Sequence, residues 1–276
     1  MATDFQPNGL VTLTTDFGQR DGYVGAMKGV MLSIDPGLNL VDLAHDLPAH
    51  QVGEGALALR ASAPHFPTGT VHLVVVDPGV GTARRPVVVA SNGHVFVGPD
   101  NGLLLPAAEA IGGGVTCRQI EDHALMPPER SATFHGRDIF APTAAALASG
   151  KVRLEEVGEV VDPRPSSLPA PSPHPQGGLV AKVVAVDRFG NLVTNVSRRV
   201  LTGLGTTPVL ELPDGTDLTV RETYGDVAVG DLLALIGSSG ALEVAVRDGS
   251  ASQRLSIRSG DGFRVHDGVG VGAHLL

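Results

Sequence analysis

Short apolar runs alternate with segments of helical character in the first half of the chain. Leu10 to Thr15 and Leu38 to Leu43 have the composition of buried strands. Asp21 to Ile34, with Asp21 as the expected N-cap, repeats apolar residues every three to four positions, and Val52 to Ser62 is rich in alanine and leucine. Because strands that alternate with helices form mainly parallel sheets, we predict an N-terminal α/β domain over residues 1–165.

The second half of the chain has a different pattern. Between Asp162 and Gly178 a proline occurs at nearly every second or third position, which favours extended, solvated backbone, so we predict a linker over residues 166–178. Beyond it, short alternating or β-branched runs, among them Leu232 to Ile236 and Arg254 to Ile257, lie between turns. These runs predict a small C-terminal β-barrel domain over residues 179–276.

Acidic residues directly follow two of the predicted strands. Asp16 ends the first strand, and Asp77 follows the run from Val74 to Val76 and precedes a glycine-rich turn that closes on Arg84 and Arg85. Open α/β sheets bind ligands beyond the carboxyl ends of their strands, so this turn is a candidate for chemistry. The alternative from the residues alone is a capped turn with a surface salt bridge.

Two histidines near the ends of predicted elements are further candidates. His45 and Asp46 follow the predicted strand that ends at Leu43, and His135 precedes an alanine-rich segment that predicts a helix ending near Ser149. A histidine at a helix entrance often caps or packs, so position alone leaves a structural role open for His135.

Two turns of the second half also carry candidate chemistry. Asp187, Phe189 and Asn191 follow one strand closely and offer a carboxylate, an aromatic face and an amide, a combination that suits a purine. Ser238 and Ser239 lie between glycines, where hydroxyl and backbone N–H groups suit a carboxylate or phosphate. An ordinary Gly-Asn turn and a plain hairpin loop are the respective alternatives.

Composition narrows the class of protein. The 276 residues carry a net charge of −9 and no basic run, which argues against nucleic acid or an anionic membrane as a partner. The single cysteine, Cys117, excludes an internal disulfide framework, and its alternating surroundings predict a small buried hydrophobe. We find no signal-peptide pattern and no apolar run long enough to span a membrane, so we expect a cytoplasmic protein.

From about Leu10 to Gly249, the chain resembles the S-adenosyl-L-methionine (SAM) hydroxide adenosyltransferases, or SAM hydrolases, whose relatives include fluorinase and chlorinase. The resemblance rests on six ordered motifs, TTDFGQRDGYVGAMKG, VVVDPGVGTARR, FVGPDNGLL, TFHGRDIFAP, DRFGNLVTN and GSSGALEVAV. It implies hydrolysis of SAM to adenosine and L-methionine with neither cofactor nor metal. It also implies a homotrimer whose sites lie between the N-terminal domain of one subunit and the C-terminal domain of the next.

The resemblance further implies roles for individual residues. Asp77, Arg84 and His135 match the groups that surround the attacking water, although Arg85 adjoins Arg84 and leaves the arginine open. His135 or Asp77 would accept or orient the water proton, because an arginine stays protonated. Asp16 matches the carboxylate that binds the ribose.

The remaining matches concern the two ends of SAM. Asp187 and Ser238 match positions that hold the methionine amine and carboxylate, Phe189 matches the aromatic residue that stacks on the purine, and Asn191 matches an adenine contact. Two further candidate substrate-binding residues differ from the halogenases. Tyr23 replaces a smaller residue, and Ser239 stands where those relatives carry an arginine.

Three alternative functions remain open at this stage. A halogenase would use chloride or fluoride as the nucleophile, but the halogenase relatives carry a tyrosine in place of Asp77 and lack the His-Gly pair. A metal-dependent phosphoesterase would use the hard ligands Asp16, His45, Asp46, Asp77 and His135, without any tight metal-binding spacing. A sensor would bind SAM or adenosine without turnover.

Overall fold

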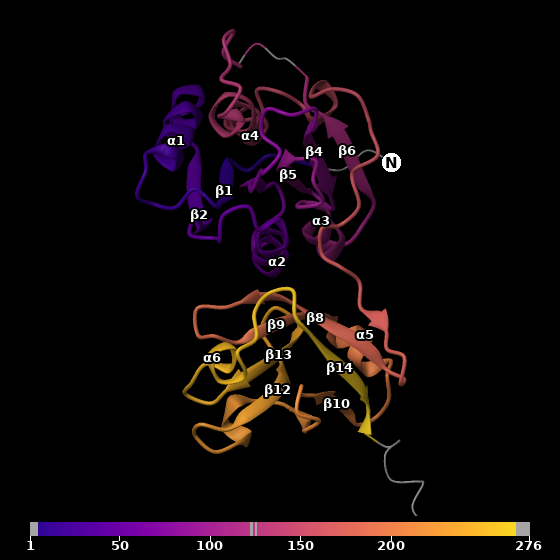
Figure 1. The fold of residues 1–276 in the computed structure, drawn as a ribbon. Helices are drawn as coiled ribbons and strands as arrows, with labels where there is room; N and C mark the ends of the chain where they lie inside the picture. Colours follow the sequence, from indigo (N-terminus) through magenta and orange to yellow (C-terminus); the bar gives the residue numbers. More distant parts are fainter. Residues whose placement is uncertain (1–4, 122–123, 125, 269–276) are drawn as a thin grey trace, which may run out of the picture. The chain divides into compact units, whose positions relative to one another are not determined.

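The computed structural model describes residues 5–268 except 122, 123 and 125. The chain divides into two compact units, Met1–Ser167 and Leu168–Leu276, and the division falls within the proline-rich segment (Figure 1). Each unit is described by itself. Within the described part of the chain, none of the helices has the length and apolar character needed to cross a bilayer.

The N-terminal unit is built on a six-stranded, mostly parallel sheet, as predicted. Its strands are β1 (Leu10–Thr15), β2 (Asn39–Ala44), β3 (Val71–Val75), β4 (Pro86–Ser91), β5 (His94–Pro99) and β6 (Val115–Gln119), in the order β2-β1-β3-β5-β4-β6. The first four in this order are parallel, and β4 pairs antiparallel with both β5 and β6. The β4–β5 hairpin turns at Asn92 and Gly93, which both have positive φ.

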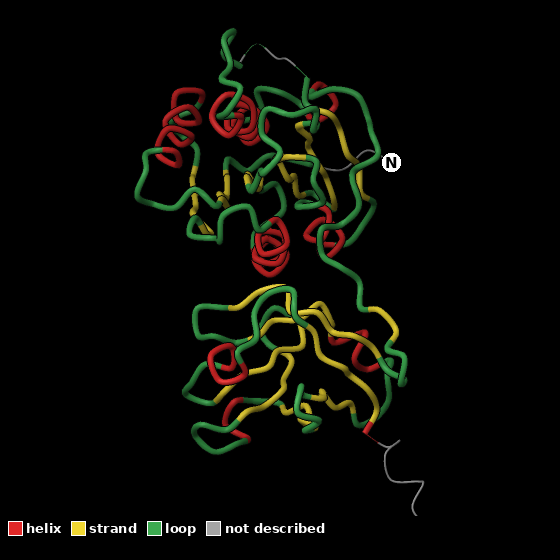
Figure 2. Tube along the Cα trace, in the orientation of Figure 1, coloured by secondary structure: helices red, strands yellow, loops and turns green. Residues whose placement is uncertain are grey.

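Helices cover both faces of this sheet. They are α1 (Tyr23–Ile34), α2 (Val52–Ser62), α3 (Leu105–Ile111) and α4 (Ala141–Ala148), with the short helices η1 (Ala63–His65), η2 (Gly136–Phe140) and η3 (Leu154–Glu156). Helices α1 and α4 lie on one face and α2 and α3 on the other, and the members of each pair contact one another (Figures 1 and 2). The predicted N-cap of α1 is wrong: Gly22 occupies that position, and no side chain caps it.

The register of the parallel strands brings candidate residues to one edge of the sheet. Thr15 of β1 pairs with Val75 of β3, and the last pair of β1 with β2 joins Thr14 and Ala44. Asp16, His45 and Asp77 therefore all follow the carboxyl ends of neighbouring strands, where ligands of open α/β sheets bind.

The C-terminal unit is the predicted β-barrel. Seven strands close it, namely β8 (Leu179–Val186), β9 (Leu192–Ser197), β10 (Pro208–Glu211), β11 (Asp217–Arg221), β12 (Leu232–Ile236), β13 (Ala241–Val246) and β14 (Gly262–Asp267). Closure comes from antiparallel pairing of β14 with both β10 and β8, and β7 (Ser172–Pro173) extends the edge of β8. Short helices α5 (Arg198–Thr202), η4 (Tyr224–Asp226) and α6 (Ala251–Leu255) lie between strands.

One predicted strand of this unit is wrong. The first half of the run from Arg254 to Ile257 belongs to α6, which ends at Leu255, because the Ser250 side chain accepts a hydrogen bond from the Gln253 backbone N–H and caps a helix there. Ile257 is still buried in the barrel core, so the apolar pattern identified a buried residue correctly but not the backbone around it.

Candidate active site

Asp77, Arg84 and His135 lie together in the N-terminal unit. Asp77 follows β3, Arg84 precedes β4, and His135 directly precedes η2. The Arg84 Nε donates to both carboxylate oxygens of Asp77 at 3.0 and 2.9 Å, and its Nη2 lies 2.5 Å from Asp77 Oδ2 and 2.8 Å from His135 Nδ1. The guanidinium thus joins a carboxylate and an imidazole that are far apart in sequence.

The burial of Arg84 and the number of its N–H groups show which donors have no acceptor. The Arg84 and Asp77 side chains are 6% and 5% exposed, and the Arg84 guanidinium also lies 5.1 Å from the centre of the Phe140 ring. A guanidinium carries five N–H groups, and the contacts above use the one on Nε and the two on Nη2. Arg84 Nη1 is buried and has no hydrogen-bond partner among the residues that the structure describes. Two N–H groups of this guanidinium are therefore buried without an acceptor among the described residues.

The same contacts determine the protonation of His135. Because an arginine N–H can only donate, His135 Nδ1 is the acceptor, and a neutral ring then carries its proton on Nε2. Burial, followed by the charge of Arg84, lowers the pKa of His135, which favours that neutral form. In this arrangement His135 presents an N–H donor at Nε2.

The structure separates the two neighbouring arginines. Arg85 donates to Asp100 Oδ2 through Nε at 2.9 Å and Nη2 at 2.5 Å, and Nη2 also donates to the Asp162 carbonyl at 2.7 Å. Arg84, not Arg85, contacts Asp77 and His135.

An aromatic cluster connects this triad to Asp16 and Tyr23. The Phe17 ring, next to Asp16, lies 6.0 Å from that of Phe134, next to His135, and Tyr23 packs on both rings at 5.8 and 5.2 Å. Tyr23 stays half exposed, and Asp16 Oδ2 accepts the His50 backbone N–H at 2.8 Å. The Asp16 turn and the triad therefore share one packed edge of the sheet.

Asp187 and Asn191 form a compact turn in the C-terminal unit. Asp187 Oδ1 accepts the backbone N–H groups of Phe189 and Asn191 at 2.9 and 2.8 Å, and Oδ2 accepts the Asn191 side-chain amide at 2.8 Å. Asn191 is 6% exposed, whereas Phe189 is 74% exposed. This turn presents an aromatic ring to solvent above a buried amide.

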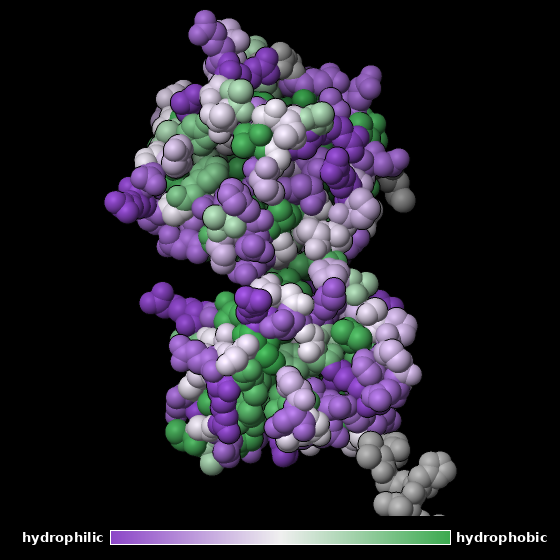
Figure 3. Space-filling model, in the orientation of Figure 1, coloured by the Kyte–Doolittle hydropathy of each residue, from purple (hydrophilic) through white to green (hydrophobic). Residues whose placement is uncertain are grey.

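Phe189 and Asn191 line a pocket of about 690 Å³, together with Tyr224, Gly225 and residues 246–249. On the visible face of this unit hydrophobic side chains gather in a strip, whereas the visible face of the N-terminal unit is largely hydrophilic (Figure 3). An exposed aromatic ring at the edge of a pocket can stack on a flat apolar group of a ligand.

The sequence analysis missed Glu243, which lies beneath the serine turn. The residue is 7% exposed, and the nearby Ser239 and Tyr224 hydroxyls favour the ionised form of its carboxyl. Burial, followed by the nearby charge of Asp187, raises the pKa of Glu243. Ser238 is exposed and Ser239 partly buried. Two neighbouring carboxylates thus lie close to the turn that was predicted to hold the methionine end of SAM. The signal was a charged residue inside an apolar alternating strand.

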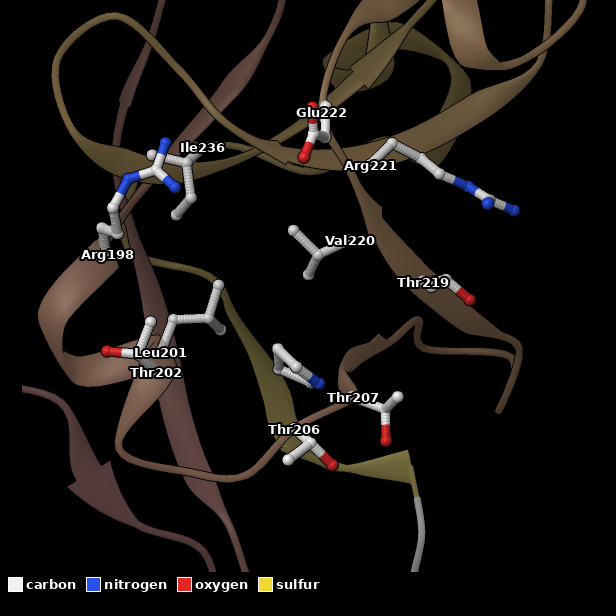
Figure 4. Close-up of a pocket in the computed structure, with 11 residues that line it drawn as sticks. Arg198, Leu201, Thr202, Thr206, Thr207, Thr219, Val220, Arg221, Glu222 and Ile236 are labelled. Carbon is white, nitrogen blue, oxygen red and sulfur yellow. The ribbon is translucent and has the colours of Figure 1, made fainter.

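A second pocket of the barrel contains none of the predicted residues. It measures about 540 Å³, with Leu201, Val220 and Ile236 around its interior and Arg198 and Glu222 at its rim (Figure 4). Its lining offers neither a stacking ring nor a buried amide.

The ligand set of a phosphoesterase does not assemble. Among the residues described, the group of three His, Cys, Asp or Glu side chains close enough to share an ion is Glu211, Asp217 and His266. None of the five residues of that alternative belongs to it. Glu211 is moreover paired with Arg264 at 3.0 Å.

Comparison with known proteins identifies the family of this chain. Residues 11–158 match the model of the SAM hydroxide adenosyltransferase N-terminal domain, and residues 181–264 match that of the C-terminal domain. The chain is 41% identical to the (R)-S-adenosyl-L-methionine hydrolase of Salinispora tropica, covering 95% of this chain and 99% of the relative. It is 30% identical to a fluorinase of an Actinoplanes species, covering 86% and 91%.

A solved structure is also similar. The crystal structure of an uncharacterized conserved protein from Thermotoga maritima superposes with a TM-score of 0.82 at 35% identity, covering 93% of this chain and 99% of that one. The two domain models together match most of the chain, and both belong to one family. The chain therefore belongs to the SAM hydroxide adenosyltransferase family.

Proposed function

We propose that this protein hydrolyses SAM to adenosine and L-methionine by attack of water on the ribose C5′. The observation that carries this proposal is the buried contact of Arg84 with Asp77 and His135, which leaves the Arg84 Nη1 donors without a partner. A fixed guanidinium that donates to the attacking oxygen favours hydroxide over water and holds it in line with the C5′–S bond. Similarity to the Salinispora hydrolase over nearly the whole chain supports the same reaction.

The chemistry needs help at the nucleophile and little at the leaving group. A C5′–O bond forms as the C5′–S bond breaks, and the electron pair of that bond neutralises the sulfonium, so methionine leaves without an acid. Water is the weak partner and must be aligned and deprotonated. Arg84 Nη1 and His135 Nε2 donate to the oxygen, and the Asp77 carboxylate accepts the water proton, because His135 Nδ1 already accepts from Arg84.

The proposed contacts with the rest of SAM are divided between the two units. In the N-terminal unit the Asp16 carboxylate binds the ribose, beside the half-exposed Tyr23. In the barrel Phe189 stacks on the purine and Asn191 contacts adenine, which the pocket lined by both residues supports.

The methionine end of SAM would bind at the serine turn of the barrel. Asp187 attracts the ammonium group, and Ser238 and Ser239 donate to the carboxylate. Glu243 adds a second carboxyl group near Asp187, and a cationic substrate bound beside them would favour its ionised form.

We also propose that the preferred substrate is the R epimer at the sulfonium. The Salinispora, Thermus thermophilus and other relatives are named (R)-S-adenosyl-L-methionine hydrolases, at 41% identity for the first two. Because the sulfonium is pyramidal, inversion moves the methionine chain relative to the ribose, so binding sites for both ends distinguish the two epimers.

We further propose that the enzyme works in the cytoplasm as a homotrimer with sites between neighbouring subunits, without metal or other cofactor. The buried Cys117 is consistent with a reducing compartment, since burial, followed by the charge of Asp100, raises the pKa of its thiol to about 11 and keeps it inert. The separation of nucleophile-binding and purine-binding residues into two units supports a composite site.

The test is product analysis with each epimer of SAM. Purified, EDTA-treated protein is incubated with either epimer in chloride-free and chloride-rich buffer, and nucleosides are separated by chromatography. Adenosine and methionine in both buffers, formed faster from the R epimer, is the expected result. A 5′-chloroadenosine product would support the halogenase alternative, which the fluorinase relatives keep relevant. Binding without turnover would indicate a sensor. Activity that EDTA treatment removes, relative to untreated protein, would indicate a metal enzyme.

A further inference from the structure

We propose that a hydrogen-bonded chain from Lys28 through Asp42, His45 and Thr15 positions the Asp16 turn for ribose binding, with His45 as its central positioning residue. The proposal rests on the proposed function, in which Asp16 binds the ribose. It gives a role to His45, a strand-end histidine that takes no part in the water-activating triad.

The chain of contacts is continuous from the protein surface to the turn. Lys28 Nζ donates to Asp42 Oδ2 at 2.6 Å, and His45 Nε2 lies 2.9 Å from Asp42 Oδ1. His45 Nδ1 lies 2.8 Å from Thr15 Oγ1, which in turn accepts the Phe17 backbone N–H at 3.2 Å. Every link has a consistent direction when the neutral His45 carries its proton on Nε2, because Thr15 then donates to Nδ1.

The outer two residues of this chain are partly exposed and the inner two are buried. Lys28 and Asp42 are partly exposed, with side chains 30% and 38% exposed, whereas the His45 side chain is 1% exposed and Thr15 is fully buried. Burial by itself would raise the pKa of Asp42, but the hydrogen bonds from Lys28 and His45 outweigh it and lower the pKa. An ionised Asp42 therefore anchors the outer end, and the buried ring transmits that anchor inward.

Two further bonds tie the same segments together around Asp16. The Gly18 backbone N–H donates to the His45 carbonyl at 2.7 Å, and the His50 backbone N–H donates to Asp16 Oδ2 at 2.8 Å. The segment that follows β2 therefore holds the Asp16 turn at its backbone and its carboxylate, and the side chain of His45 holds it through Thr15. Rotation of the turn would require several of these bonds to break together.

The chain offers a matched control on the same strand. Thr12 of β1 is also fully buried, and its Oγ1 lies 2.8 Å from Nδ1 of another buried histidine, His72. His72 Nε2 lies 3.2 Å from His94 Nδ1, and the His72 ring stacks on Phe96. Neither contact is with a candidate site residue. The two Thr–His pairs are alike in residue types, distance and burial, and differ in whether they lead to Asp16.

The experiment compares Thr15→Val with Thr12→Val, which each remove one buried hydroxyl at nearly constant shape. We expect Thr15→Val to raise KM for SAM and Kd for adenosine about tenfold with kcat within about threefold, because it loosens ground-state binding of the ribose. We expect Thr12→Val to lower thermal stability and leave KM unchanged. Thr15→Ser, which keeps the hydroxyl, should restore KM.

A double-variant cycle tests whether the effect passes through Asp16. In an Asp16→Asn background, Thr15→Val should weaken adenosine binding no further, since the positioned carboxylate is already gone. Equal KM values for Thr15→Val and Thr12→Val, in an enzyme that hydrolyses SAM normally, would overturn the positioning role alone. Failure of the unmodified protein to hydrolyse SAM or to bind adenosine would refute the proposed function itself.

Discussion

Replacement of Arg84 by lysine separates the charge of this residue from its planar fork. Arginine donates through Nε and Nη2 to Asp77 and through Nη2 to His135, and in the proposed mechanism its two Nη1 N–H groups contact the nucleophile. A lysine ammonium keeps one positive charge beside Asp77 but cannot reach all three positions. Misplacement of an attacking group by about 1 Å can cost on the order of 10²-fold in rate, so we expect kcat to fall about 10²-fold or more.

Binding and folding should change much less than turnover. Arg84 contacts no group assigned to the ribose, purine or methionine, so KM should stay within about threefold. Arg84→Met, by contrast, leaves the Asp77 carboxylate buried without a counterion, which costs about 3–5 kcal/mol of stability. Thermal unfolding therefore identifies Arg84→Lys as the variant that isolates catalysis.

The assay is adenosine release at saturating SAM, measured by chromatography. Arg85→Lys is the matched control, because the adjacent arginine contacts Asp100 and the Asp162 carbonyl and should leave kcat unchanged. If Arg84→Lys turns over at the rate of the unmodified enzyme, or if KM rises in proportion to the loss of kcat, the fork does not act on the nucleophile.

Three more outcomes follow from the structure. Burial, followed by the charge of His94, lowers the pKa of His72 to about 3, below its ordinary value in the unfolded chain. Stability should therefore fall as the pH drops below about 6.5, by about 2 kcal/mol at pH 5, because protons then bind to this residue in the unfolded chain only. The urea midpoints of the unmodified protein and His72→Asn should be closer together at pH 5 than at pH 7.5, and an equal difference at both pH values would contradict this. Glu243→Gln should raise KM for SAM about fivefold and leave adenosine affinity unchanged by calorimetry, since the lost charge faces the methionine end; equal loss for both ligands would exclude that placement. Co-refolding of His135→Ala with Asp187→Asn should recover about a quarter of full activity if each site combines two subunits at random, and none if each site lies within one chain.

Hydrophobic patterning predicted the scaffold of this protein well. Buried runs ended at Asp16 and Asp77, and the parallel register of β1 and β3 brings both to one edge of the sheet. Periodicity predicted the wrong secondary structure where a helix cap sets the backbone conformation. Arg254 to Ile257 was predicted as a strand, but Ser250 caps a helix that includes Arg254. The roles of individual site residues and the domain boundaries of 165 and 178 stay predictions.

The directions of individual side chains could not be predicted from the sequence. Arg84 and Arg85 are adjacent and chemically identical, and only the geometry of the turn sends one to Asp77 and the other to Asp100. Glu243 was missed because a single charged residue in an alternating strand is usually solvated, whereas this one is covered by Tyr224 and Ser239. Long-range contacts of this kind depend on the packing of distant segments.

Closure of the barrel has a consequence for biosynthesis. The strand that closes it, β14 (Gly262–Asp267), is the last strand in the described part of the chain and pairs with β8, whose first residue is Leu179. The sheet and helices of the N-terminal unit are complete by Glu156, so this unit can fold on the ribosome while the barrel still lacks its final strand. Until then β8 and β10 have open edges that favour pairing with other chains. Premature termination before Gly262 should therefore yield aggregates in place of a soluble fragment.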